Sequence, residues 1–239
     1  MPLPWLDAEP VEFPATHTAL DDPTGLLAAG GALTADWLET AYRHGIFPWF
    51  EEGQPILWWT PDPRLVLWPE QLHLSRSLRK SLRQTACHFS MDTAFAEVMT
   101  ACAEPRDDYG GTWITLDMQQ AYEELHQRGL AHSLEVWDDK ELVGGLYGIA
   151  IGRAFFGESM FSRQTDASKM ALARLVKQLQ RWGFELIDCQ VSSQHLLSLG
   201  AQEVSRELFE GKLAHLTRAE GRSGFWRLDA DLIQCDDAI

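Results

Sequence analysis

The sequence lacks the cysteine and histidine patterns of a metal centre or a disulfide framework. Its four cysteines, Cys87, Cys102, Cys189 and Cys235, lie far apart and form no C-x-x-C pair. The eight histidines include no H-x-x-x-H spacing. Structural zinc sites and small disulfide-rich domains depend on spacings of those kinds. We therefore expect a metal-free protein that uses no cofactor.

Targeting signals and long apolar runs are also missing. The first residues, Met1 to Trp5, lack the basic start and apolar run of a signal peptide. No stretch approaches the roughly 18 uninterrupted apolar residues of a membrane-spanning helix. These absences predict a cytoplasmic protein without membrane contact, and we expect it to act as a monomer.

Basic residues are scarce, with 20 Lys and Arg against 35 Asp and Glu and a formal net charge of −15. This balance argues against broad, nonspecific binding of nucleic acid, but it leaves room for a local basic patch. One such patch lies on a predicted helix from Ser75 to Arg83, at spacings i, i+3, i+4 and i+7, and comprises Arg76, Arg79, Lys80 and Arg83. A charge run is usually a solvated helix face. Because the rest of the chain is acidic, we favour a phosphate-binding face.

Tryptophan, in contrast, is abundant, with ten among 239 residues. The segment up to residue 62 is dense in Gly, Pro and aromatic residues and predicts a small aromatic-rich N-terminal domain at 1–62, followed by a second domain at 63–239. Prolines in 46–50 and 56–64 argue against central strands there. Most of the tryptophans are expected to fill the core, while one or two could form a stacking platform for a base.

The order of predicted elements after residue 62 defines the fold class. Helices come first, then an antiparallel meander through 133–137, 142–150 and 154–161, a helix at 167–182 and a strand at 184–191. A helix at 206–217 and a last strand at 224–228 follow. An antiparallel meander, a crossover helix and a parallel strand form the order of the GNAT acyltransferase fold. We predict an α+β, GNAT-like domain with a mixed, mainly antiparallel sheet and flanking helices.

The strand at 184–191 carries the first sign of chemistry. It is apolar except for Asp188 and Gln190, which are two residues apart and so point to the same side of a regular strand. A carboxylate and an amide in a buried strand cost free energy unless a polar partner meets them. Glu158 on the neighbouring strand could complete a polar centre.

The turn between the strand at 154–161 and the next helix contains no glycine. A GNAT enzyme that uses coenzyme A needs a glycine-rich turn there, whose N–H groups hold the pyrophosphate at the helix start. The turn in this chain is Ser162-Arg163-Gln164-Thr165-Asp166-Ala167-Ser168-Lys169. Its composition weighs against coenzyme A and for another acyl donor.

A set of motifs, in order between about Gly25 and Phe209, resembles the leucyl/phenylalanyl-tRNA–protein transferases. The motifs are Gly45-Ile-Phe-Pro-Trp-Phe50, Trp58-Trp-Thr-Pro-Asp-Pro-Arg64, Gly111-Thr-Trp-Ile-Thr115, Gly157-Glu-Ser-Met-Phe-Ser162, Ala167-Ser-Lys169 and Leu186-Ile-Asp-Cys-Gln190. Thr60 and Ser193 depart from the residues most usual in that family. The resemblance implies transfer of Leu or Phe, with Met as a candidate third residue, from aminoacyl-tRNA to the α-amine of proteins that begin with Lys or Arg. Such transfer marks proteins for N-end-rule degradation.

The resemblance also implies roles for individual residues. Asp188, Gln190 and Glu158 would form the catalytic centre, with Asp188 as a base, as an electrostatic anchor for the acceptor, or as a mixture of the two. The pocket for the donor side chain would be formed by Trp113, Tyr122, Phe155, Met160, Leu172 and Ile187. Trp49 would stack on the terminal adenosine. Our own hypothesis from the charge pattern is that the basic helix face holds the tRNA backbone.

Two other functions stay open at this point. A coenzyme-A acyltransferase is the runner-up, and a test of acyl transfer from acetyl-CoA would separate it from an aminoacyltransferase. A non-catalytic module that binds tRNA or peptide is the third, and it would bind tRNA without any transfer.

Overall fold

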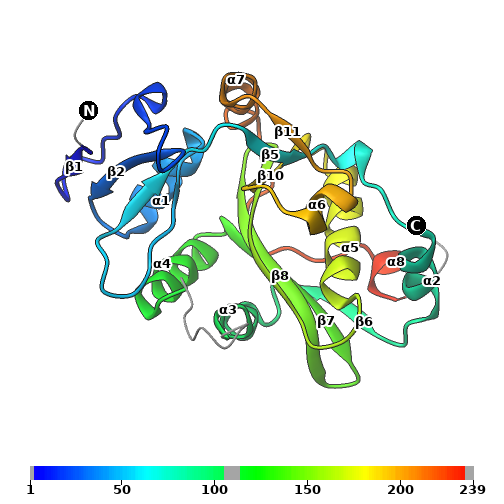
Figure 1. The fold of residues 1–239 in the computed structure, drawn as a ribbon. Coiled ribbons are helices and arrows are strands. Elements are labelled where there is room, and N and C mark those ends of the chain that lie inside the picture. The colour runs from blue at the N-terminus through cyan, green and yellow to red at the C-terminus, as the bar shows by residue number, and fades with distance from the viewer. Residues whose placement is uncertain (1–2, 105–113, 235–239) are drawn as a thin grey trace.

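The computed structural model describes residues 3–104 and 114–234, which form two sheets surrounded by helices (Figure 1). The strands are β1 (Trp5–Leu6), β2 (Leu26–Gly30), β3 (Phe47–Pro48), β4 (Leu57–Trp59), β5 (Arg64–Leu67), β6 (His88–Met91), β7 (Ala131–Asp138), β8 (Glu141–Ile151), β9 (Ala154–Ser162), β10 (Leu186–Gln190) and β11 (Gln202–Val204). The α-helices are α1 (Ala35–Arg43), α2 (Arg76–Gln84), α3 (Phe95–Ala103), α4 (Leu116–Gln127), α5 (Ala167–Arg181), α6 (Gln194–Ser198), α7 (Arg206–Leu216) and α8 (Ala230–Ile233). Two short 3-10 helices are η1 (Thr16–Thr18) and η2 (Pro69–Gln71).

The N-terminal sheet has the strand order β1-β2-β4-β3 and lies beside α1. The expectation that 56–64 holds no central strand was wrong, because β4 pairs with both β2 and β3. Its three residues lie between Pro55 and Pro61, so neither proline takes part in the ladder. β3, which contains Pro48, is at the sheet edge, where a missing N–H is tolerated. Trp37 and Trp58 stack at a centroid distance of 5.7 Å in the core of this region.

The second sheet has the order β11-β5-β10-β9-β8-β7-β6. β6 to β9 form an antiparallel meander, α5 crosses over, and β10 pairs parallel to β9. This is the arrangement predicted from the sequence, and the α+β class with a separate small N-terminal region is confirmed. β5 pairs with the other side of β10, and β11 and β6 are the two edge strands, which the predicted meander of 133–161 did not include.

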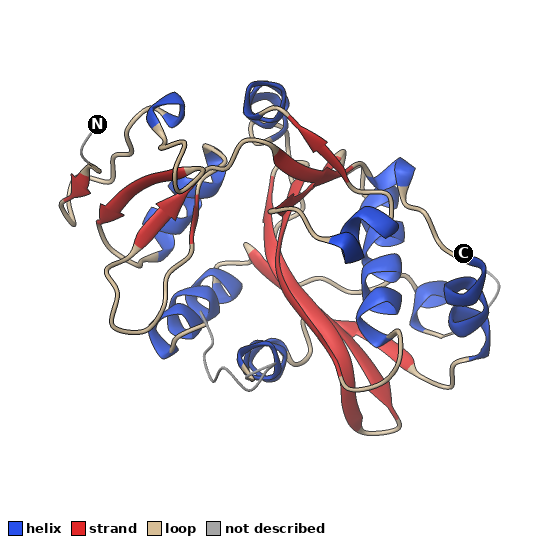
Figure 2. Ribbon diagram, in the orientation of Figure 1, coloured by secondary structure: helices blue, strands red, loops and turns tan. Residues whose placement is uncertain are grey.

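Helices cover both faces of the large sheet (Figure 2). α3 and α4 lie on one side of the long strands, together with the N-terminal sheet, and α5 lies on the other side. α5 approaches β8 closely at Gly144, where an added Cβ would lie 2.5 Å from the Cβ of Ala167. Gly183, at φ 75°, follows the C-cap residue of α5, a place where a positive φ is common.

The predicted last strand at 224–228 is wrong. These residues form no strand and pair with none in the described chain. The backbone N–H of Trp226 donates instead to the Asp92 carboxylate at 2.6 Å, and the indole ring is buried against His132. Side-chain packing and a carboxylate acceptor therefore hold this segment in place of a ladder.

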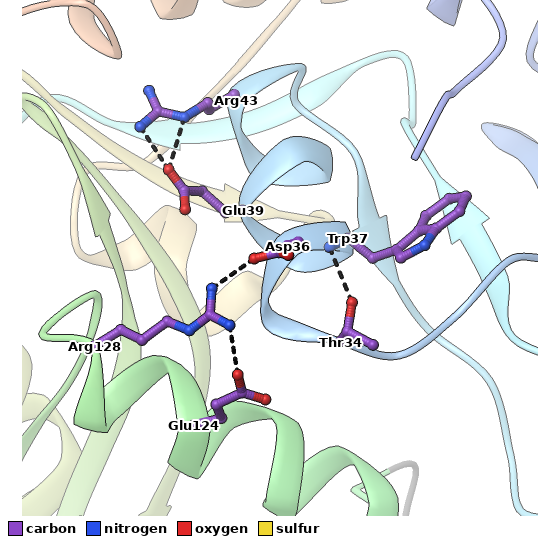
Figure 3. A network of polar contacts seen from close by, with 7 residues as sticks. All are labelled: Thr34, Asp36, Trp37, Glu39, Arg43, Glu124 and Arg128. Carbon is purple, nitrogen blue, oxygen red and sulfur yellow. Dashed lines mark hydrogen bonds and ion pairs between the residues drawn. The ribbon is translucent and has the colours of Figure 1, made fainter. Parts of the chain in front are cut away.

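The helix α1 of the N-terminal region packs against α4 of the large domain, and the ion pair of Arg128 with Asp36 bridges the two (Figure 3). Arg128 contacts Asp36 on α1 at 2.6 Å and Glu124 on its own helix at 2.5 Å. Thr34 caps α1 by accepting the N–H of Trp37. The proposed boundary at 62/63 falls between β4 and β5, at the point where the chain leaves the small sheet.

Candidate active site

The site is at the point where β9 and β10 separate. The parallel pairing runs from Leu186↔Ala154 to Asp188↔Phe156 and then stops. β9 continues to Ser162, whereas β10 ends at Gln190. Glu158 and Gln190 therefore lie just past the last paired residues, where backbone and side-chain groups can face a ligand instead of a neighbouring strand.

β10 is irregular at this point. Its pairing with β5 shifts register between Asp188 and Gln190, and Gln190 has φ 64°. A non-glycine residue in this conformation costs about 1–3 kcal/mol and persists where the surroundings hold it. The backbone N–H of Gln190 donates to Asp188 Oδ1 at 2.9 Å, which fixes the bend. The simple alternation used to place Asp188 and Gln190 on one face thus ends at Asp188, and a hydrogen bond joins the two residues.

Glu158 is the centre of a polar network. Its Oε1 accepts from Gln190 Nε2 at 2.7 Å, and its Oε2 accepts from the Tyr122 hydroxyl at 2.9 Å. Burial raises the pKa of Glu158 to about 7, and the nearby Asp188 adds to the rise, while hydrogen bonds from the tyrosines and Gln190 oppose it. A carboxyl group with this pKa exchanges protons near neutral pH.

Asp188 is fully buried in an ion pair with Arg64 on β5. Arg64 Nε donates to Oδ1 at 2.8 Å and Nη2 donates to Oδ2 at 2.6 Å, the geometry of a bidentate pair. The guanidinium also lies 4.8 Å from the ring centre of Phe47 and 4.6 Å from that of Phe209. Both carboxylate oxygens are therefore occupied by the protein itself.

A cavity of about 760 Å³ opens beside this network. It lies between the diverging strands and extends over α5 and α6. Of the residues that the sequence assigns to the site, those that line the cavity are Phe155, Glu158, Met160, Leu172, Ile187 and Gln190. Apart from Glu158 and Gln190, these are apolar side chains, so the cavity combines an apolar wall with a polar end. Asp188 is not among the lining residues.

The other expected substrate-binding residues are placed differently. Tyr122 on α4 is buried and reaches the site through its bond to Glu158. Trp49 is 44% exposed, follows β3 and lies against Trp59 at 5.7 Å, an arrangement that leaves ring surface open for stacking. Trp113 lies outside the described residues.

The four cations of the basic patch are exposed on α2, while Leu78 and Leu82 on the same helix are buried. Within the described ranges, none of the four forms an ion pair with a carboxylate. α2 packs against α5, and Ser81 donates to Asp166 just before α5 begins. Since the first turns of α5 line the cavity, the patch lies on a helix that adjoins the cavity wall.

Sequence reasoning missed three residues at or beside the site. Tyr42 on α1 contacts Tyr122, and Arg64 pairs with Asp188. His195 on α6 lines the cavity with a buried Nε2 that has no partner in the described chain, and burial lowers its pKa. Tyr42 and Arg64 lie 80 and 124 positions from their partners, so no local spacing could reveal them. His195 follows β10 closely in the sequence and could have been noted.

Comparison with known proteins identifies the family. Residues 66–214 match the model for "Leucyl/phenylalanyl-tRNA protein transferase", and residues 31–62 match the N-terminal domain of the same family. A leucyl/phenylalanyl-tRNA–protein transferase of Aromatoleum aromaticum is 59% identical over 94% of this chain and 94% of its own length. One from Nitrosospira multiformis is 54% identical over 97% of this chain and 100% of its own.

Solved structures overlap this fold less closely. A GCN5-related N-acetyltransferase from Kribbella flavida aligns with a TM-score of 0.35 at 11% identity, over 69% of this chain and 58% of that one. The family assignment therefore depends on the sequence matches.

Proposed function

Since the chain belongs to the leucyl/phenylalanyl-tRNA–protein transferase family, we propose that the Glu158 network and the adjoining cavity transfer Leu or Phe from aminoacyl-tRNA to a protein α-amine. The acceptors would begin with Lys or Arg, and Met is a third candidate donor residue. The observation that carries the proposal is a carboxyl group with a pKa of about 7 at the polar end of an apolar cavity.

The reaction needs positioning and the transfer of one proton. The donor is an activated ester, and the neutral amine nitrogen attacks its carbonyl carbon. A C–N bond forms, the C–O bond to the ribose of the terminal adenosine breaks, and the ribose oxygen takes up a proton. Glu158 accepts the proton that the amine loses. The pKa of Glu158 lies close to that of a protein α-amine, about 7.7–8.0, so a proton can pass from the amine to the carboxylate at little cost in free energy.

Asp188 and Gln190 hold the base in position. The ion pair with Arg64 occupies Asp188, which in turn accepts the backbone N–H of Gln190. The Gln190 side chain donates to Glu158, so it cannot itself serve as a base and orients the carboxylate instead. Of the roles left open for Asp188, we favour an electrostatic one that acts through Gln190, because the carboxylate does not face the cavity.

The donor side chain fits the apolar part of the cavity. Phe155, Leu172 and Ile187 are buried there, and the half-buried Met160 can adapt its shape to a flexible or flat side chain. A β-branched side chain is stiff at χ1 and wider near the backbone, so Val and Ile should be poor donors. We also place Trp113 and Tyr122 in this pocket, and Trp49 against the terminal adenosine.

The tRNA body would lie on the basic patch of α2, formed by Arg76, Arg79, Lys80 and Arg83. These cations are exposed and lie next to α5, whose first turns form one wall of the cavity. Phosphate contacts of this kind are largely independent of sequence, which suits an enzyme that accepts several tRNAs.

The residues at the start of α5 disfavour coenzyme A as the donor. Asp166 precedes the helix in a left-handed conformation, with its carboxylate bonded to Ser81 and Lys169. A carboxylate thus lies beside the helix N-terminus at which a pyrophosphate would bind, and its negative charge would repel that group.

We further propose that the protein acts as a monomer in the cytoplasm, where aminoacyl-tRNA is available, without a cofactor. No helix in residues 3–104 or 114–234 is long and apolar enough to cross a membrane. The outcome of the transfer would be a new N-terminal Leu or Phe that marks the acceptor for degradation.

The test is incubation with labelled Leu-tRNA and a peptide that begins with Arg. Label on the peptide is expected, with little label when the peptide begins with Glu. No label is expected when acetyl-CoA with a labelled acetyl group replaces the labelled Leu-tRNA. Retained tRNA binding without any transfer would favour a binding module instead.

A further inference from the structure

A chain of hydrogen bonds connects the N-terminal helix α1 to the proposed base. Tyr42, fully buried on α1, has its hydroxyl 2.5 Å from that of Tyr122 on α4. The Tyr122 hydroxyl donates to Glu158 at 2.9 Å, and Gln190 donates to the other Glu158 oxygen. The two domains thus meet in hydrogen bonds at the proposed reacting centre as well as through the exposed Arg128–Asp36 ion pair of Figure 3.

The position of the protons follows from the donor inventory. A tyrosine hydroxyl has one proton to donate. The proton of Tyr122 points to Glu158, so the proton between the two tyrosines comes from Tyr42. Burial raises the pKa of both tyrosines well above the usual value, so both stay protonated donors at neutral pH. A donor that itself accepts a hydrogen bond is polarised and becomes a stronger donor.

We propose that Tyr42 is a positioning residue for the transfer reaction, and that the N-terminal domain completes the acid–base centre by supplying this hydroxyl. Tyr42 acts on the protonation and orientation of Glu158 both through Tyr122 and through its own polar interaction with the carboxylate. The inference rests on the proposed function, in which Glu158 accepts the proton of the attacking amine.

A second contact from the same region supports this assignment. Phe47 on β3 lies over the guanidinium of Arg64, which holds Asp188 and thereby the bend that places Gln190. Both ends of the Glu158 network therefore receive a buried side chain from the N-terminal region. The other titratable or charged groups around Glu158 and its cavity are Tyr147, Asp188, Cys189, Glu104, Arg163 and His195.

The first experiment is the pH dependence of kcat/KM for Tyr42→Phe. Removing the Tyr42 hydroxyl weakens Tyr122 as a donor, so the Glu158 carboxylate loses stabilisation and its pKa rises. The acidic limb of the profile of kcat/KM against pH should therefore move upward by about half a unit. Activity should fall several-fold at pH 6.5 and recover above pH 8.5.

The matched control is Asp36→Asn, which removes an exposed ion pair from the same α1–α4 contact without touching the hydrogen-bond chain. It should weaken domain packing slightly and leave the acidic limb in place. Melting temperatures of both variants separate loss of packing from a change in the base.

A variant with 3,5-difluorotyrosine at position 42 keeps the ring and hydroxyl and donates more strongly, because fluorine acidifies the phenol. It should shift the acidic limb to lower pH, opposite to Tyr42→Phe. Shifts of opposite sign cannot come from loosened packing. The same titration can be followed by ¹³C NMR of the Glu158 carboxyl without substrate, which covers a Tyr42→Phe variant that is too unstable for kinetics.

Identical acidic limbs, or identical NMR titrations, for the wild type and the difluorotyrosine variant would overturn the role of Tyr42. Failure of the proposed function would look different. The wild-type protein would then show no transfer from Leu-tRNA, while the NMR titration of Glu158 would still report whether Tyr42 affects the carboxyl group.

Discussion

The two sides of the β9–β10 separation are built from different interactions, hydrogen bonds and ion pairs on one side and apolar contacts on the other. On the side of the N-terminal region, Glu158, Asp188 and their partners form a network in which nearly every polar atom has a defined partner. On the other side, apolar side chains line a cavity of about 760 Å³. The stability of the network depends on charges and hydrogen-bond directions, so the loss of a single polar atom disrupts it. The fit of a side chain in the cavity depends on volume, so small changes are tolerated. Mutations should therefore have large effects on the network side and graded effects on the cavity side.

The largest effect is expected for Glu158→Gln. This change keeps the size of the side chain but removes the base, and general-base catalysis contributes about 10²–10⁴ to turnover. We expect a loss of that order in kcat with KM for Leu-tRNA nearly unchanged. The control is Glu185→Gln, which changes an exposed carboxylate paired with Arg153. Wild-type turnover in Glu158→Gln would remove Glu158 from the proton transfer.

Arg64→Met tests the buried ion pair. Removing one partner leaves the Asp188 charge uncompensated in the interior, which costs about 3–5 kcal/mol of stability. Chemical unfolding should show a lower midpoint. Arg153→Met removes an exposed ion pair and should cost about 1 kcal/mol or less. Equal losses for the two variants would mean that the Arg64–Asp188 pair does not stabilise the junction.

The raised pKa of Glu158 also predicts a stability effect. In the folded state the pKa is about 7, above the usual 4.5, so the folded state prefers the protonated form. The contribution of Glu158 to the free energy of unfolding is then fully present below about pH 4.5 and is lost as the pH rises through 7. Glu158→Gln avoids this loss and should become more stable than the wild type above pH 7, by about 1–3 kcal/mol. A constant difference in melting temperature between pH 5 and pH 8 would contradict this.

On the cavity side, Leu172→Ala should change donor choice by a smaller amount. Enlarging the pocket removes contacts to Leu and admits wider side chains. The free-energy difference between Leu and Val donors should change by about 1–3 kcal/mol. We expect kcat/KM to fall for Leu-tRNA and the ratio of Val to Leu use to rise. Leu208→Ala, which truncates a 48% exposed side chain on α7, is the control. Unchanged donor ratios would place the donor side chain elsewhere.

The smallest effect is expected on the basic patch. Replacing Arg79 and Arg83 by Ala should weaken the binding of different Leu-accepting tRNAs alike. The slope of log affinity against log salt should fall by about 0.7–0.9 for each phosphate that the variant no longer binds. Transfer from a short aminoacyl-adenosine should change little, because that donor lacks the stem phosphates. Arg128→Ala, away from α2, should leave the slope unchanged, and an equal loss with the short donor would point to an effect on folding.

The sequence by itself determined the local features and the family. Residue spacing located the helices α2 and α5, and the polar residues in an apolar strand singled out Asp188 and Gln190. These features depend on neighbours within a few residues, which is why patterns reveal them. The motifs that carry the resemblance are likewise continuous stretches of chain.

Only the tertiary structure decided how the site is completed. Pairing of Arg64 with Asp188 joins residues 124 positions apart, and the Tyr42–Tyr122 contact spans 80 positions and two domains. The β4 position inside the small sheet and the unpaired path of 224–228 also depend on partners distant in sequence. The pKa of Glu158 follows from burial among those distant groups, and burial is a property of the folded chain that no local spacing contains.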